Sequence, residues 1–180
     1  MINENNIIAA VRDEISFDLA INSKAKIIFH LSPDIENMQM LSKKAHNKNK
    51  KVFIHIDLTS GLGKDLSGIR YVKKADIDGI ISTRANLIKL ANECGLTTVQ
   101  RVFIVDSHSI DTTMDLSKSA KPDMIEVMPG VSEKIIKILC SKTATPIIAG
   151  GLIDTKEEVK IALKSGAASI STSNQQLWEL

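Results

Sequence analysis

The sequence predicts a single α/β domain spanning residues 1–180, a compact (β/α)8 barrel of the TIM type. Short apolar runs alternate with longer amphipathic runs along the whole chain, which is typical of parallel βαβ units. Eight apolar runs suffice to close a barrel. No glycine-rich turn follows the first run, as it would in a dinucleotide-binding open sheet. Because such barrels typically have about 250 residues, we expect short loops and a vestigial helix or two; an open doubly wound sheet is the alternative.

The expected strands are short, aliphatic and bounded by polar or turn residues. They cover residues 7–11, 25–31, 51–58, 79–83, 97–102, 124–128, 146–149 and 168–171. Between them, helical spacing of apolar residues marks residues 34–47, 85–94, 132–142 and 155–165. Gly95 and Gly166 are placed to end two of these helices, and Thr155 with Glu158 forms a capping box.

Composition restricts the function classes. Hydrophobic residues make up 43% of the chain and aromatic residues 3%, so the core is aliphatic, and a net charge of +2 does not by itself indicate a nucleic-acid partner. Cys94 and Cys140 are far apart and form no zinc pattern, which indicates reduced thiols in the cytoplasm and no metal. The polar residues 1–6 do not resemble a signal peptide, and no run of about 18 apolar residues predicts a membrane span.

Strand alternation predicts which polar side chains line the carboxyl-end mouth of the barrel. In the third strand, Val52, Ile54 and Ile56 form the helix-packing face, so His55 and Asp57 point inward. The same reasoning on the other strands predicts a polar wall of Arg12, His30, His55, Asp57, Ser82, Arg84, Gln100 and Glu126. These groups could satisfy one another in a buried network. As a set they favour a ligand pocket, because buried Arg12 and Arg84 would need anionic partners.

The ends of the last two strands predict a phosphate cradle. A buried strand leads into Gly150 and Gly151, which let backbone N–H groups approach an anion. About twenty residues later the final strand ends in Thr172, Ser173 and Asn174, which can open a short helix over residues 174–180. Either motif alone would indicate only a tight turn or an N-cap. Together, in this order, they match the loops that build phosphate sites in this fold.

Several motifs taken together resemble a known family. They are residues 55–58 (His-Ile-Asp-Leu), 61–65, 79–84, 100–103, 106–107, 122–130, 148–153 and 171–174. In this order, over nearly the whole chain, they resemble the glycerol uptake operon antiterminator family of bacteria. The resemblance implies a barrel-shaped regulator, not an enzyme, with glycerol-3-phosphate as effector and no cofactor. It also implies a partner, the leader RNA of a messenger, on which the protein lets transcription pass a terminator.

Side-chain roles toward that effector are hypotheses. Asp57, Gln100 or Glu126 could bind its two hydroxyls, and Arg12 or Arg84 could help neutralise the phosphate dianion. For RNA, the densest basic run covers residues 43–51 at the bottom of the barrel, with Lys48, Lys50 and Lys51 as candidates.

Alternatives to this RNA surface stay open. The basic run could be a solvated helix end, and the glycine loop at residues 61–65 could instead order over the ligand and form the RNA surface. If RNA binds at the bottom, the effector must act at a distance or through a homo-oligomer.

The competing class is an enzyme acting on a small phosphosugar. A Schiff-base mechanism lacks a lysine that points from a strand into the mouth. A metal-dependent hydrolase could use His30, His55, Asp57 and Glu126, and an isomerase could use Asp57 with Glu126.

Overall fold

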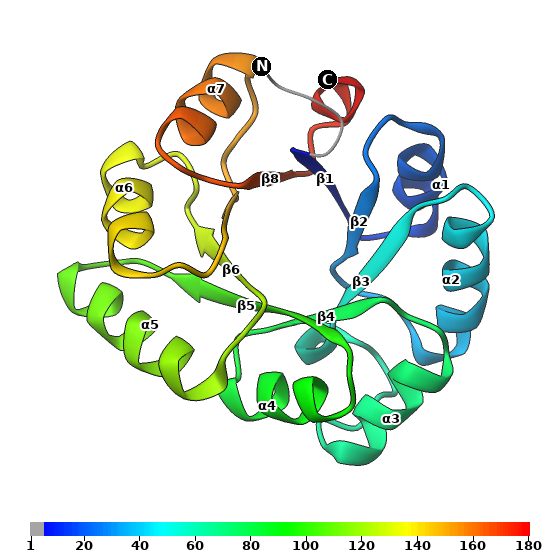
Figure 1. The fold of residues 1–180 in the computed structure, drawn as a ribbon. Helices are drawn as coiled ribbons and strands as arrows, with labels where there is room; N and C mark the ends of the chain where they lie inside the picture. The colour runs from blue at the N-terminus through cyan, green and yellow to red at the C-terminus, as the bar shows by residue number, and fades with distance from the viewer. Residues whose placement is uncertain (1–5) are drawn as a thin grey trace.

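The computed structural model describes residues 6–180 and contains a closed barrel of eight parallel strands (Figure 1). The strands are β1 (Ile7–Val11), β2 (Ile27–His30), β3 (Lys51–His55), β4 (Gly79–Ser82), β5 (Thr97–Phe103), β6 (Met124–Met128), β7 (Ile147–Gly150) and β8 (Ser169–Thr172). Each strand pairs with the next, and β8 pairs with β1. The predicted barrel is confirmed, with strand ends shifted by up to three residues. Residues 1–5, which make up most of the polar N-terminal segment, lie outside the described part.

Helices form an outer layer around the barrel (Figure 1). They are α1 (Glu14–Asn22), α2 (Met38–His46), α3 (Leu66–Lys74), α4 (Ala85–Glu93), α5 (Ser107–Ala120), α6 (Glu133–Lys142) and α7 (Lys156–Lys164), with 3-10 helices η1 (Ile35–Asn37), η2 (Ile56–Leu58) and η3 (Gln175–Glu179). The predicted capping box of Thr155 and Glu158 starts α7. No helix within residues 6–180 combines the length and the apolar character needed to cross a membrane.

The last helical element of the barrel is shorter than the helices of the other units. After β8 the chain forms η3, where other units have an α-helix. Leu177 and Trp178 of η3 are buried, and the indole Nε1 of Trp178 donates to the carbonyl oxygen of Thr172 at 2.8 Å. Five residues thus cover the outer side of β8 and β1, which is the reduced helix expected from the chain length.

Two apolar layers define the two faces of every strand. The barrel interior is filled by Ile8, Ala10, Phe29, Leu31, Phe53, Ile81, Val99 and Ile148. The layer between strands and helices contains Ile28, Ile54, Ile80 and Val102. Neighbouring residues on a strand point to opposite faces, so this division fixes which polar side chains can reach the mouth.

Candidate functional site

A cavity of about 140 Å³ opens at the carboxyl ends of the strands, between the end of β8 and the loop after β7. It is lined by Ala10, Arg12, Leu31, Arg101, Met128, residues 151–154 and residues 171–173. The two predicted cradle segments therefore meet at one cavity, with two arginines in its wall. Arg12 is exposed at its rim, whereas Arg101 is buried.

Gly150 and Gly151, the two glycines of the cradle, have different structural roles. A Cβ on Gly150 would lie 2.6 Å from Oε1 of Glu126 and 2.8 Å from Oγ of Ser171. Gly150 therefore makes room for a buried polar contact. Gly151 has a φ of +74°, which favours glycine, and it lines the cavity. Gly130 stabilises this loop, because its N–H donates a hydrogen bond to the carbonyl oxygen of Gly150 at 2.6 Å.

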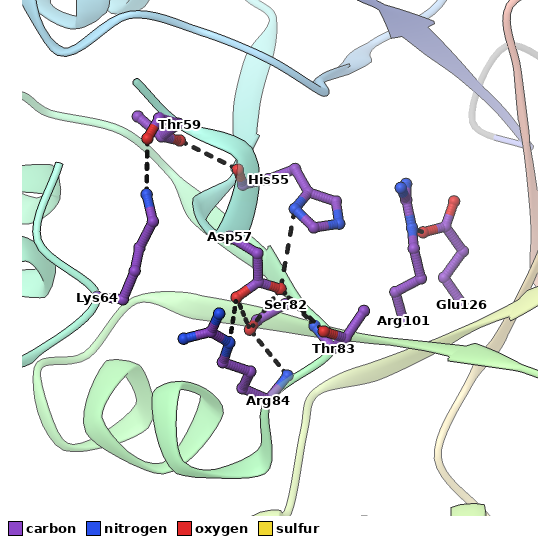
Figure 2. Close-up of polar contacts among 9 residues, drawn as sticks. All are labelled: His55, Asp57, Thr59, Lys64, Ser82, Thr83, Arg84, Arg101 and Glu126. Carbon is purple, nitrogen blue, oxygen red and sulfur yellow. Dashed lines mark hydrogen bonds and ion pairs between the residues drawn. The ribbon is translucent and has the colours of Figure 1, made fainter. Parts of the chain in front are cut away.

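A buried ion pair between Arg101 and Glu126 lies beside the cavity. Strand alternation predicted that Glu126 faces inward but did not predict this for Arg101. Nε of Arg101 on β5 donates to Oε2 of Glu126 on β6 at 2.6 Å (Figure 2). The hydroxyl of Ser171 on β8 donates to the other carboxylate oxygen at 2.5 Å. Glu126 is completely buried, so the arginine and the hydroxyl compensate a charge that water cannot reach.

The inward orientation predicted for three wall residues, His30, Ser82 and Gln100, is wrong. Ser82 directly follows the interior residue Ile81 on β4, so it lies on the outer face of the strand. His30 lies on the outer face of β2, where its ring packs 5.7 Å from the ring of Phe17 on α1. Gln100 lies on the outer face of β5, where its Oε1 accepts from the Ser117 hydroxyl of α5 at 3.3 Å. Parallel strands are buried on both faces, so a polar residue can also face the helices.

Asp57 organises a separate network at the ends of β3 and β4 (Figure 2). Its carboxylate accepts from the Ser82 hydroxyl at 3.1 Å, and from the backbone N–H and hydroxyl of Thr83 at 2.8 and 3.1 Å. Nε of Arg84 lies 3.5 Å from Oδ1 of Asp57. The Arg84 side chain is 55% exposed, so neither it nor Arg12 is the buried cation predicted from the sequence.

His55 lies between this network and the Arg101–Glu126 pair (Figure 2). Its Nδ1 is 3.9 Å from Oδ2 of Asp57. Burial, followed by the positive charge of Arg101, lowers the pKa of His55, which favours the neutral imidazole. Nearby, the Lys64 ammonium donates to the Thr59 carbonyl oxygen at 2.6 Å, and burial lowers the pKa of Lys64.

The predicted ligand residues thus fall into two groups. Arg12, Gly151, Thr172 and Ser173 line the cavity, and Glu126 contacts the lining residues Arg101 and Ser171. The cavity wall does not include Gly150, Asn174, His30, His55, Asp57, Ser82, Arg84 or Gln100. The Asn174 side chain caps η3 instead, by accepting from the Gln176 N–H at 3.0 Å.

One of the three lysines predicted to bind RNA has a structural role instead. Lys50 is buried, and its ammonium donates to the carbonyl oxygens of Ser23, at 2.6 Å, and Ala25. It therefore cannot contact RNA as predicted. Lys48 and Lys51 are exposed at the opposite end of the barrel from the cavity.

The four residues predicted for a hydrolytic metal site are not brought together. His30 lies outside the barrel, away from Glu126 in the interior. Over residues 6–180, no group of three or more histidine, cysteine, aspartate or glutamate side chains is placed to hold a metal ion.

Comparison with known proteins places this chain in a family. Residues 7–178 match the model of the glycerol-3-phosphate responsive antiterminator family. The uncharacterized protein YgcP of Escherichia coli K12 is 36% identical over all of this chain and 95% of its own length.

Solved structures agree with the family match. A glycerol uptake operon antiterminator regulatory protein from Listeria monocytogenes is 33% identical, with a TM-score of 0.92 over 98% of this chain and 96% of its own. An antiterminator-related protein from Thermotoga maritima is 32% identical, with a TM-score of 0.87 over 98% and 99%. An aldolase that is 15% identical shares the fold alone, with a TM-score of 0.80 over 100% and 95%. The chain therefore belongs to the glycerol-3-phosphate responsive antiterminator family.

Proposed function

We propose that this chain is a transcription antiterminator that binds glycerol-3-phosphate in the mouth cavity and acts on leader RNA. The observation that carries the effector assignment is the meeting of the Gly151 loop, the end of β8 and the exposed Arg12 at one cavity. The family match supports the regulatory role. An antiterminator must reach nascent RNA, so the proposed location is the cytoplasm.

The charges of the cavity suit a phosphate. Arg101 is already paired with Glu126, so the cation that attracts an anion is Arg12 at the rim. The loop at Gly151 and the hydroxyl-bearing Ser173 add short polar groups that can approach phosphate oxygens closely. Asp154, also in the wall, is an acceptor for the hydroxyls of the glycerol end.

Calorimetric titration tests the effector site. The protein should bind glycerol-3-phosphate and should not measurably bind glycerol at the same concentration. Removal of one charge-assisted hydrogen bond to phosphate in Arg12→Gln should weaken binding about tenfold or more, given about 1.5–3 kcal/mol for such a bond. Lys134→Gln, an exposed cation outside the cavity wall, is the matched control. Equal binding of glycerol and glycerol-3-phosphate would contradict the proposed site.

The regulatory role has its own assay. A transcription template with a leader terminator should give more read-through when protein and glycerol-3-phosphate are both present than with either alone. The same incubation without nucleic acid should leave glycerol-3-phosphate unconsumed. Turnover of the phosphate ester with unchanged read-through would favour the phosphosugar enzyme instead.

A further inference from the structure

Lysines are concentrated at one end of the barrel. The segments that run from the last turn of each helix to the first residue of the next strand contain thirteen of the chain's nineteen lysines. The same segments contain four of the acidic residues, and all four arginines lie elsewhere. A chain with a net charge of +2 therefore has a strongly positive bottom face, opposite the cavity.

Helix geometry explains only some of these lysines. Lys43, Lys44, Lys73, Lys74 and others are in last helical turns, where a cation interacts favourably with the helix dipole. Lys24, Lys26, Lys48, Lys51 and Lys121 lie outside the helices, beyond that effect. Lys24 also has a structural contact, because its ammonium donates to the carbonyl oxygen of Glu179 at 2.8 Å. Like charges held close together repel, so a concentration of exposed lysines such as Lys48 and Lys51 opposes folding and indicates a binding role.

The structure holds four of the loop lysines on neighbouring segments. The N–H of Lys51 donates to the carbonyl oxygen of Lys26 at 2.9 Å, where β2 and β3 begin side by side. Buried Lys50 binds the carbonyl oxygens of the loop that contains Lys24. Asn49 has a φ of 54°, a left-handed turn between Lys48 and buried Lys50. Lys24, Lys26, Lys48 and Lys51 are all exposed, and we call them the lysine patch.

We infer that the lysine patch is the RNA-binding surface and contacts the phosphate backbone rather than the bases. This inference rests on the proposed function, which supplies RNA as the partner. Lysine ammonium groups are point charges suited to phosphates, and the patch contains neither the arginine forks nor the aromatic rings that read or stack bases. The effector cavity is at the opposite end of the strands, so effector and RNA occupy the protein together.

Salt dependence of RNA binding tests the patch quantitatively. The probes are a labelled single-stranded poly(U) and a terminator-type stem-loop RNA, measured by anisotropy over a range of KCl with saturating glycerol-3-phosphate. The log–log slope of affinity against salt concentration changes by about 0.7 for each single-strand phosphate that the protein neutralises. Lys48→Gln/Lys51→Gln should therefore reduce the poly(U) slope by about 1.4, and the affinity of this variant for glycerol-3-phosphate should stay unchanged.

A matched pair controls for total charge. Lys134→Gln/Lys156→Gln removes the same two charges at the first turns of α6 and α7, on the mouth side. This pair should leave the slope nearly unchanged. An equal reduction in both pairs, or a reduction in the mouth pair alone, would overturn the assignment of the patch.

Two further outcomes separate the inference from the function on which it rests. RNA binding by the unmodified protein that is insensitive to Lys48 and Lys51 refutes the patch and leaves the antiterminator role standing. No binding of either RNA refutes the role together with the patch. Patch-dependent binding to phosphatidylserine vesicles without RNA binding would assign the surface to a membrane and also refute the inference.

Discussion

The buried imidazole of His30 makes the stability of the barrel depend on pH. Burial lowers the pKa of His30 from 6.5 to about 4, and the nearby charge of Asp13 acts in the opposite direction. The unfolded chain therefore binds a proton below pH 6.5 that the folded chain does not accept until about pH 4. Stability from this residue is complete above pH 6.5 and falls as the pH decreases toward 4. The whole difference is about 3 kcal/mol, of which about 2 kcal/mol is lost by about pH 5.

Urea unfolding at about pH 7.5 and about pH 5 isolates this contribution when the wild type is compared with His30→Phe. The substitution keeps a ring against Phe17, and Nδ1 of His30 has no hydrogen-bond partner to lose. The fall in free energy of unfolding between the two pH values should be about 2 kcal/mol smaller in the variant. His46 has a pKa raised by its bond to Asp78 and so stabilises the fold at low pH, but it is present in both proteins and cancels. An identical pH dependence in both proteins would refute the reasoning. Loss of glycerol-3-phosphate binding in the variant would argue that His30 faces the mouth.

Three substitutions test other parts of the structure. Gly150→Ala places a Cβ 2.6 Å from Oε1 of Glu126, so it should destabilise the fold by about 1–3 kcal/mol, measured by urea unfolding; an unchanged midpoint would contradict the close contact. Lys50→Met removes the donor to the carbonyl oxygens of Ser23 and Ala25 and should cost about 1–3 kcal/mol, whereas Lys48→Met at an exposed position should change stability by less than about 0.5 kcal/mol. Asp57→Asn replaces an acceptor of several hydrogen bonds and should lower the melting temperature; a melting temperature equal to that of the wild type would show that the network contributes little.

Periodicity was sufficient to predict the barrel because each strand and helix is a local pattern. The assignment of strand faces needed more than local patterns. In β3 the aliphatic residues Val52 and Ile54 mark the helix-packing face, and His55 faces inward as predicted. In β2 every residue before His30 is apolar, so the pattern contains no marker of the inner face. A neutral imidazole can pack among apolar groups, which is why the outer layer accommodates His30.

The face of β5 was ambiguous for a different reason. Gln100 and Arg101 are adjacent, so only one of them can face the interior. Val99 faces the interior, and therefore Arg101, two residues later on the same strand, does so too. The contact that fixes this choice is the ion pair with Glu126 on the neighbouring strand. The role of Gly150 depends in the same way on Glu126 and Ser171. Such pairings depend on strand register and side-chain placement, which single-strand periodicity does not contain.

The separation of the two charged ends has a thermodynamic consequence. In the proposed arrangement, glycerol-3-phosphate at the mouth would not touch RNA at the lysine patch, so the effector could control RNA binding only by favouring one of two states of the barrel or of its assembly. Such coupling is reciprocal: a tenfold gain in RNA affinity caused by glycerol-3-phosphate requires a tenfold gain in glycerol-3-phosphate affinity caused by RNA, about 1.4 kcal/mol. Titration of glycerol-3-phosphate with and without saturating stem-loop RNA measures the second factor. Two unequal factors would mean that the two titrations do not report the same binding equilibrium, and weaker effector binding in the presence of RNA would show that the ligands oppose each other.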